Sequence, residues 1–241
     1  MVVSSYIDMN SIPLSTITLN FTDSSQLELN EYTMDLSSFS LLKSFKCGDN
    51  SFNSVRKFII NGLNQLESIV IGKNSFTLSK NSYDERLNRE FHVTNCASLR
   101  ELIIDRYSFS DYHIFELNSL PNLKSITIGS SSTSYNFYYV ENIEFSSLPS
   151  LENLYLGAYS FYYCHDIIFE SINENEYYNT IDLPKLKSIQ LQSYALYGDG
   201  SSERSESYYG YMNTLSMKSI AKSNRLDTRS PFSHFFLWLW V

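Results

Sequence analysis

The stretch Leu123-Lys124-Ser125-Ile126-Thr127-Ile128-Gly129 decides how this chain folds. Apolar residues follow Leu123 three and five positions later, at Ile126 and Ile128, and a glycine follows at position six. A second apolar line precedes Leu123 by eight, six and three positions. Apolar residues two positions apart indicate a short strand with one buried face. The stretch therefore predicts two short strands in one structural unit.

The same pattern recurs along almost the whole chain, which identifies it as an internal repeat with copies 24 to 35 residues apart. The leading position is occupied by Leu14, Leu42, Leu66, Leu99, Leu123, Leu151 and Leu186, and by Met217 in a decayed last copy. The upstream line contributes the pairs Met34/Leu36, Phe58/Ile60, Phe91/Val93, Phe115/Leu117, Ile143/Phe145 and, displaced, Ile181/Leu183. One unit alone cannot bury its apolar side chains. We therefore expect the units to stack, with like strands pairing in parallel.

A short motif follows many copies, in which Ser and Phe come after Asn or Tyr, as at residues 50–52, 74–76, 107–109 and 159–161. Cys164 follows Phe161 by three positions. The apolar line resembles the leucine-rich repeat, and the Ser-Phe motif with Cys164 is similar to the BspA-like variety, whose signature is Ala-Phe-x-x-Cys. The resemblance covers about residues 11 to 222. It departs from the family in having Ser in place of Ala, in its irregular copy lengths and in lacking the Asn of the commonest repeat class.

The repeat and the resemblance predict a mainly β fold: a leucine-rich-repeat solenoid with two short parallel β-ladders per coil, about seven to eight rungs and little helix. We expect a lead-in at residues 1–10, the array at 11–222, and a polar linker with an apolar tail at 223–241. The apolar columns fail before this tail, which predicts that it is not part of the array. We expect the tail to be a truncated or mis-read end of a longer chain, and the alternatives are a cap over the last rung or a peripheral membrane anchor. The polar insertion at 77–90, which includes Arg89, predicts a solvated loop.

Composition excludes several classes of protein and partner. A formal charge of −8 over 241 residues argues against nonspecific binding to nucleic acid or anionic lipid. No signal-peptide pattern opens the chain, and no apolar run reaches the roughly 20 residues that span a bilayer. This favours the cytoplasm by default, and the cell surface if the chain is a fragment. Cys47, Cys96 and Cys164 occupy core positions, which predicts free buried thiols.

A search for catalytic residues finds none. The chain has no CxxC, HExxH, P-loop or GxGxxG pattern. Cys164, His165 and Asp166 are adjacent in sequence, which is not how a nucleophile, its base and an orienting acid are arranged in space. Strand alternation turns His92 outward, and the single glycines after the strands predict a turn conformation. We therefore expect no enzyme, no cofactor and no metal.

Two sets of residues are candidates for contacting a protein partner. Outward positions of the leucine-line strands form columns that include Ser68, Val70, Glu101, Ile103, Ser125, Thr127, Asn153, Tyr155 and Gln190. Loops rich in Tyr, Ser and Gly, a composition typical of binding loops, contribute Tyr138, Tyr139, Tyr162, Tyr163, Tyr208 and Tyr209. An ordinary solvated face, and tyrosines that pack over their own loops, are the alternatives. We expect a non-enzymatic protein-interaction scaffold with an unidentified partner. The alternative function is a segment of a larger surface-displayed, adhesion-type protein.

Overall fold

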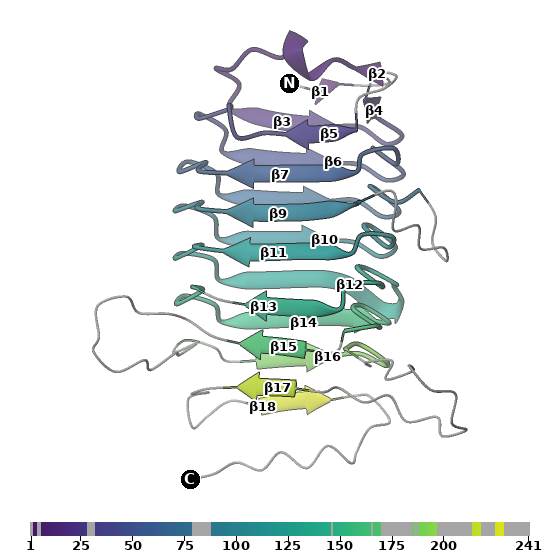
Figure 1. The fold of residues 1–241 in the computed structure, drawn as a ribbon. Helices are drawn as coiled ribbons and strands as arrows, with labels where there is room; N and C mark the ends of the chain where they lie inside the picture. The colour runs from purple at the N-terminus through teal and green to yellow at the C-terminus, as the bar shows by residue number, and fades with distance from the viewer. Residues whose placement is uncertain are drawn as a thin grey trace.

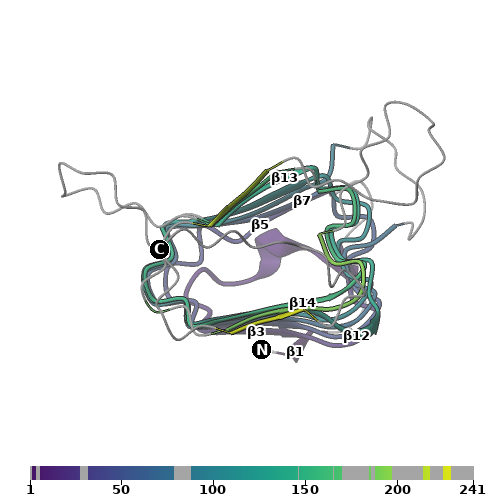
Figure 2. The ribbon, with the colours of Figure 1, turned by 90° about the horizontal axis from the view of Figure 1, so that it is seen from below.

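The computed structural model describes residues 2–3, 6–27, 32–78, 88–145, 147–164, 166–169, 185, 188–196, 214–217 and 225–228. Within these residues the chain is mainly β, and its one helical element is the 3-10 turn η1 (Met9–Ser11). Most strands belong to two large parallel sheets, one of nine strands and one of seven. Figure 1 shows the strands of each sheet stacked one above the next, and Figure 2 shows the two sheets facing each other.

Sheet order follows chain order in both sheets. The nine-stranded sheet contains β1 (Val2–Val3), β3 (Thr18–Phe21), β6 (Ser44–Cys47), β8 (Ser68–Ile71), β10 (Glu101–Ile104), β12 (Ser125–Thr133), β14 (Asn153–Ala158), β16 (Ser188–Leu191) and β18 (Arg225–Thr228). The seven-stranded sheet contains β5 (Thr33–Asp35), β7 (Lys57–Asn61), β9 (Glu90–Thr94), β11 (Ile114–Asn118), β13 (Asn142–Phe145), β15 (Asp166–Phe169) and β17 (Thr214–Met217). A separate parallel pair joins β2 (Tyr6–Ile7) and β4 (Gln26–Leu27).

From β3 onward the chain alternates between the two large sheets. We call one strand of the nine-stranded sheet and the strand of the seven-stranded sheet that follows it a layer. Parallel pairing places equivalent residues of successive layers side by side, beginning with Phe45, Ile69 and Leu102. The same column continues through Ile126, Leu154 and Ile189. For the copies that begin at Leu42 to Leu186, this register is the one that the repeat predicts.

In the first copy the register is shifted by two residues from the one that the sequence predicts. β3 pairs with β6 through Leu19↔Phe45 and Phe21↔Cys47, so Leu19 and Phe21 take the core positions. Leu14 is 61% exposed and Ile17 is 54% exposed. Ile17, Leu19 and Phe21 occupy alternate positions, so either Ile17 with Leu19 or Leu19 with Phe21 could fill the two core positions. The structure uses the second pair, which includes an aromatic ring. The Phe21 ring contacts Phe45 and Phe52, with ring centroids 5.9 and 5.1 Å apart.

The last copies also differ from the prediction. Met217 belongs to β17 of the seven-stranded sheet, where it pairs with Phe169, and does not lead a copy. β18 pairs with β16 through Leu226↔Ile189, so the ladder continues past residue 222. β1 likewise pairs with β3, which brings part of the expected lead-in into the nine-stranded sheet. The pair expected at Ile181 and Leu183 lies outside the described residues, and β15 is the strand that adjoins β13.

The core between the sheets contains a ladder of phenylalanines. Successive layers contribute Phe76, Phe109, Phe137 and Phe161, all fully buried. Adjacent rings stack with centroids 4.7 to 5.2 Å apart and planes within 9° of parallel. Such pairs stabilise by about 0.5–1.5 kcal/mol beyond the area that they bury. The ladder therefore fixes the spacing of the layers from inside.

A ladder of buried serine hydroxyls runs beside the phenylalanines. The Ser75 hydroxyl donates to Gly48 O at 2.8 Å and accepts from the Ser51 backbone N–H at 3.0 Å. One layer further on, the Ser108 hydroxyl donates to Gly72 O and accepts from Ser75 N–H. Each hydroxyl satisfies two backbone groups of the preceding layer, which accounts for serine at this position of the motif.

The glycines that follow the strands serve close packing more than turn conformation. A Cβ at Gly72 would lie 2.5 Å from Gly48 C, and one at Gly157 would lie 2.4 Å from Ser130 N. Of these glycines only Gly129 has a positive φ, at +80°. Positive φ angles in the turns fall instead on the Asn or Tyr and the Phe of the Ser-Phe motif, as at Tyr107 and Phe109. The sequence prediction located the turn correctly but gave the wrong reason for the glycine.

Cys47, Cys96 and Cys164 are buried thiols in core positions, as predicted. Burial raises the pKa of the Cys47 thiol to about 12. Residues 130–133 extend β12 beyond a register shift that follows Ile128.

Candidate functional site

The outward residues of the nine-stranded sheet form the first candidate surface, which we call the strand face. Parallel pairing aligns Val70, Ile103, Thr127, Tyr155 and Gln190 in one column. The same pairings align a second column of Ser68, Glu101, Ser125 and Asn153. Neighbouring strands lie about 4.8 Å apart, so these side chains follow one another at contact distance. The structure thus brings together all nine residues that the sequence assigned to this surface.

Exposure differs along the strand face. Val70, Ile103, Thr127 and Tyr155 are half-buried, whereas Glu101, Asn153 and Gln190 are exposed. Serine and asparagine hydrogen-bond along their own column, with Ser68 Oγ donating to Ser44 Oγ at 3.2 Å. The result is an apolar stripe beside a polar one.

A groove of about 370 Å³ borders the strand face at the carboxyl ends of its strands. Its lining includes Lys46, Val70 and Ile103 from the sheet. It also includes Gly48, Gly72 and Gly129 from the turns. The groove therefore lies where the apolar stripe meets the closely packed turns.

Three carboxylates from the turns line the same groove, at Asp23, Asp49 and Asp105. Each uses one oxygen to accept a backbone N–H: Asp23 from Asp49 at 2.8 Å, Asp49 from Lys73 at 2.7 Å and Asp105 from Arg106 at 2.6 Å. These bonds orient the carboxylates at the groove. With Lys46 as the basic residue of the lining, the groove carries an excess of negative charge.

The second candidate surface is a tyrosine cluster on the turns that follow β10, β12, β14 and β16. Its members are Tyr107, Tyr135, Tyr138, Tyr139, Tyr159, Tyr162, Tyr163 and Tyr194. Tyr138 stacks on Tyr162 with centroids 4.8 Å apart, and Tyr139 stacks on Tyr163 at 5.5 Å. All eight are half-buried. Stacked and edge-on contacts thus join the rings of neighbouring turns into one surface.

Burial raises the pKa of Tyr138, and repulsion from the neighbouring tyrosines adds to the shift. Burial also raises the pKa of Tyr139 and Tyr159. Tyr138, Tyr139 and Tyr159 therefore stay protonated at neutral pH. Tyr208 and Tyr209, the other two predicted tyrosines, lie outside the described residues.

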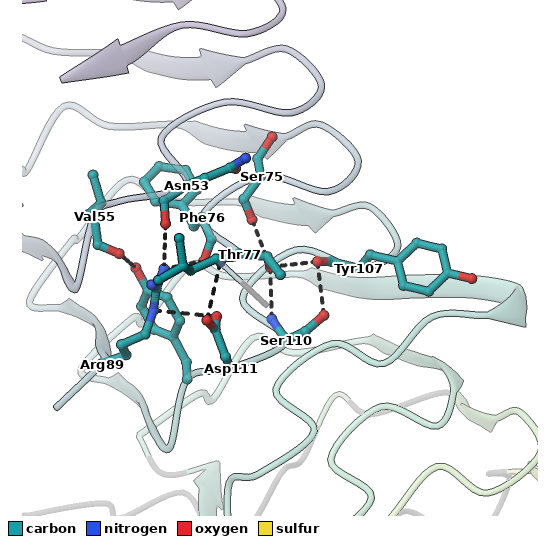
Figure 3. Close-up of polar contacts among 11 residues, drawn as sticks. Asn53, Val55, Ser75, Phe76, Thr77, Arg89, Tyr107, Ser110 and Asp111 are labelled. Carbon is teal, nitrogen blue, oxygen red and sulfur yellow. Dashed lines mark hydrogen bonds and ion pairs between the residues drawn. The ribbon is translucent and has the colours of Figure 1, made fainter. Parts of the chain in front are cut away.

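A buried ionic site at Arg89 was missed by the sequence prediction, which placed this residue in a solvated loop. The Arg89 side chain is 1% exposed, and its Nε lies 3.4 Å from Asp111 Oδ1. Its Nη2 donates to Phe76 O at 2.8 Å and to Asn53 O at 3.1 Å (Figure 3). The guanidinium carbon lies 4.8 Å from the centroid of the Tyr112 ring. Carbonyls, a carboxylate and a ring together offset the cost of burying this charge.

One signal in the sequence pointed to this site. The third residue after the phenylalanine of the turn is apolar in three copies, at Val55, Val140 and Cys164, but the copy of Phe109 has Tyr112. A phenol in a buried column needs a hydrogen-bond acceptor. Tyr112 OH donates to Val55 O at 2.7 Å across the intervening layer, and burial raises its pKa.

On the outer side of the seven-stranded sheet, His92 faces outward as predicted. Its Nδ1 lies 2.6 Å from Glu116 Oε2, and its Nε2 lies 3.2 Å from Glu90 Oε2. Glu90 also pairs with Lys57 at 3.0 Å. Burial alone would raise the pKa of Glu90, but the hydrogen bonds from Lys57 and His92 outweigh it and lower the pKa.

Among the described residues, no group of three or more His, Cys, Asp and Glu side chains is arranged to hold a metal ion. Over the same part of the chain, no helix has both the length and the apolar character needed to cross a membrane. His165, His234 and the apolar tail at 234–241 lie outside the described residues.

Comparison with known proteins identifies no relative: no protein-family model, no curated protein and no solved structure matches this chain.

Proposed function

We propose that this chain is a leucine-rich-repeat solenoid, similar to the BspA-like variety, with about seven to eight rungs. Support comes from the alternation of strands between two parallel sheets and from the alignment of core columns between layers. The Ser-Phe motif recurs in its turns with the same pair of positive φ angles, as at Asn74/Phe76 and Tyr159/Phe161. Recurrence of one backbone conformation at equivalent positions is what a repeat architecture requires.

The function that this geometry supports best is non-enzymatic binding of a protein partner through the strand face. The observation that carries the proposal is the in-register apolar stripe of Val70, Ile103 and Tyr155, which borders an open groove. Large side chains that are half-buried on a rigid sheet lose little entropy when a partner covers them. Solenoid proteins commonly bind ligands along such extended faces.

The charge of the groove defines the chemistry of the partner. Val70 and Ile103 provide apolar contact, and Asp23, Asp49 and Asp105 provide negative charge on the turn side. An extended segment that alternates basic and apolar side chains matches this arrangement, because opposite charges steer encounter and fix register. The partner is therefore a protein with an extended, basic segment.

Binding of two labelled peptides tests this proposal. One peptide alternates Lys with Leu, and the other alternates Glu with Leu. Fluorescence anisotropy should show that the Lys peptide binds and the Glu peptide does not. The variant Val70→Ala/Ile103→Ala/Tyr155→Ala should bind the Lys peptide at least about tenfold more weakly, since loss of one interface anchor costs 1 kcal/mol or more.

A matched control removes apolar side chains from the opposite surface. Ile59→Ala/Ile114→Ala alters outward residues of β7 and β11 in the seven-stranded sheet. This variant should bind the Lys peptide with the affinity of the native chain. Equal binding of both peptides, or equal affinity of all three proteins, would refute binding at the strand face.

A further inference from the structure

Four of the stacked tyrosines form a compact group that we call the tyrosine quartet: Tyr138, Tyr139, Tyr162 and Tyr163. The planes of Tyr138 and Tyr162 lie within 13° of parallel, and those of Tyr139 and Tyr163 within 8°. Edge contacts join the two stacks, with Tyr138 and Tyr163 centroids 5.1 Å apart and Tyr162 and Tyr163 centroids 5.3 Å apart. Every ring of the quartet therefore contacts at least one tyrosine ring of the adjacent layer.

The backbone holds these rings at their spacing. Tyr163 N–H donates to Tyr138 O at 3.1 Å, and Phe161 N–H donates to Asn136 O at 2.9 Å. Beneath the quartet, Phe137 and Phe161 stack in the core with centroids 5.2 Å apart. The two turns thus form one rigid unit, in which contact between the phenols persists and does not depend on chance collisions.

The quartet is also accessible from solvent, because each of its rings is half-buried. Tyr138 and Tyr162 are 24 residues apart in sequence and lie in the turns that follow β12 and β14, which pair in adjacent layers. A covalent bond between the rings would consequently join two layers directly. Such a bond would limit the separation of the layers in the unfolded chain, as a disulfide does.

We propose that the tyrosine quartet is a site of oxidative cross-linking, at which a phenol of one layer couples to a phenol of the next under a peroxide-dependent haem peroxidase. Each of the two phenols loses one electron and one proton to become a phenoxyl radical. The electrons and protons reduce one hydrogen peroxide to two waters. The radicals join through the carbons adjacent to their hydroxyls, and the hydrogens on those carbons move to the oxygens. The chain loses two hydrogens in total.

The purified chain treated with hydrogen peroxide and a peroxidase tests this proposal. The monomer should lose the mass of two hydrogens and gain dityrosine fluorescence. Peptide mapping should join the segment containing Tyr138 and Tyr139 to the segment containing Tyr162 and Tyr163. The yield of this link should not change on dilution, because the coupling is intramolecular, and the Tm of the product should rise.

Two variants make the test specific. Tyr138→Phe/Tyr139→Phe keeps rings in the stacks but removes the phenols, and it should abolish the link. Tyr32→Phe alters a tyrosine that lies beside Arg56, 4.3 Å from its guanidinium carbon, and it should leave the yield unchanged. A wild-type yield in the double variant, or products that are only intermolecular, would overturn the proposal. Circular dichroism of the double variant confirms that it folds.

Discussion

Arg89 and Asp111 form an ion pair that is sealed from water inside the protein. Their side chains are 1% and 3% exposed, and Arg89 Nε lies 3.4 Å from Asp111 Oδ1. Asp111 also accepts a hydrogen bond from Leu78 N–H through Oδ2 at 3.2 Å. The pair therefore ties the segment that enters β9 to the turn that precedes β11.

Removing one charge of this pair should destabilise the protein strongly. Asp111→Asn leaves the Arg89 guanidinium buried without a counter-charge, at a cost of about 3–5 kcal/mol in the free energy of unfolding. The double variant Arg89→Met/Asp111→Asn should lose less than the two single changes together. Urea denaturation measures the free energy of unfolding of Arg89→Met, of Asp111→Asn and of the double variant. Lys57→Ala, which breaks the more exposed pair with Glu90, is the control and should cost less than about 1 kcal/mol. A comparable loss of unfolding free energy in Asp111→Asn and Lys57→Ala would show that water reaches the Arg89 guanidinium.

Tyr112 should make stability depend on pH in the alkaline range. Its folded-state pKa is raised above the ordinary value of 10.0, chiefly by burial. Above that pH the unfolded phenol loses its proton while the folded phenol keeps it, so the stabilisation decreases as pH rises. At neutral pH, Tyr112→Phe should cost about 1 kcal/mol for the hydrogen bond to Val55 O. Urea denaturation between about pH 8 and 11 should show this difference shrinking, and a constant difference would contradict the assignment.

Gly72 should not tolerate a side chain. An alanine Cβ would lie 2.5 Å from Gly48 C, so β6 and β8 would have to separate. We expect Gly72→Ala to cost about 1–3 kcal/mol or more, with faster amide hydrogen exchange in both strands. Gly62 is the matched control: its φ is +74° and no atom lies within 4 Å of an added Cβ. Gly62→Asn should be nearly neutral, because Asn adopts this conformation readily. Equal effects would show that backbone conformation, and not spacing, selects Gly72.

The serine ladder should also prove essential to the stacking of layers. Ser75→Ala leaves Ser51 N–H and Gly48 O without their shared partner, and each unsatisfied buried group costs about 1–3 kcal/mol. Ser44→Ala removes a hydroxyl that bonds Ser68 Oγ on the outer face and should change stability by less than about 0.5 kcal/mol. Thermal melting of both variants gives the comparison. If Ser75→Ala has the same Tm as the native chain, a water molecule or a shifted backbone replaces the hydroxyl as hydrogen-bond partner.

The apolar spacing of the sequence determined the parallel register of the central layers. In Leu123–Gly129 and its copies, the inward positions of the strands carry the apolar side chains that fill the core, so a slip by one residue would expose these side chains. The positions of the buried cysteines and the strand-face columns followed from that register. At the first copy two apolar frames were present, and only packing of Phe21 against Phe45 and Phe52 distinguished them.

Tertiary structure alone decided the features that depend on neighbours distant in sequence. Arg89 reads as a surface residue because its partners are carbonyls and a carboxylate that the fold brings together, and carbonyls leave no trace in a sequence. The glycines are required by the backbone of the preceding layer, about 24 residues away. Tyr138 and Tyr162 stack because they lie in the turns that follow β12 and β14, which pair in adjacent layers. Spacing along the chain specifies which face a residue occupies, but contact between layers determines what that residue meets there.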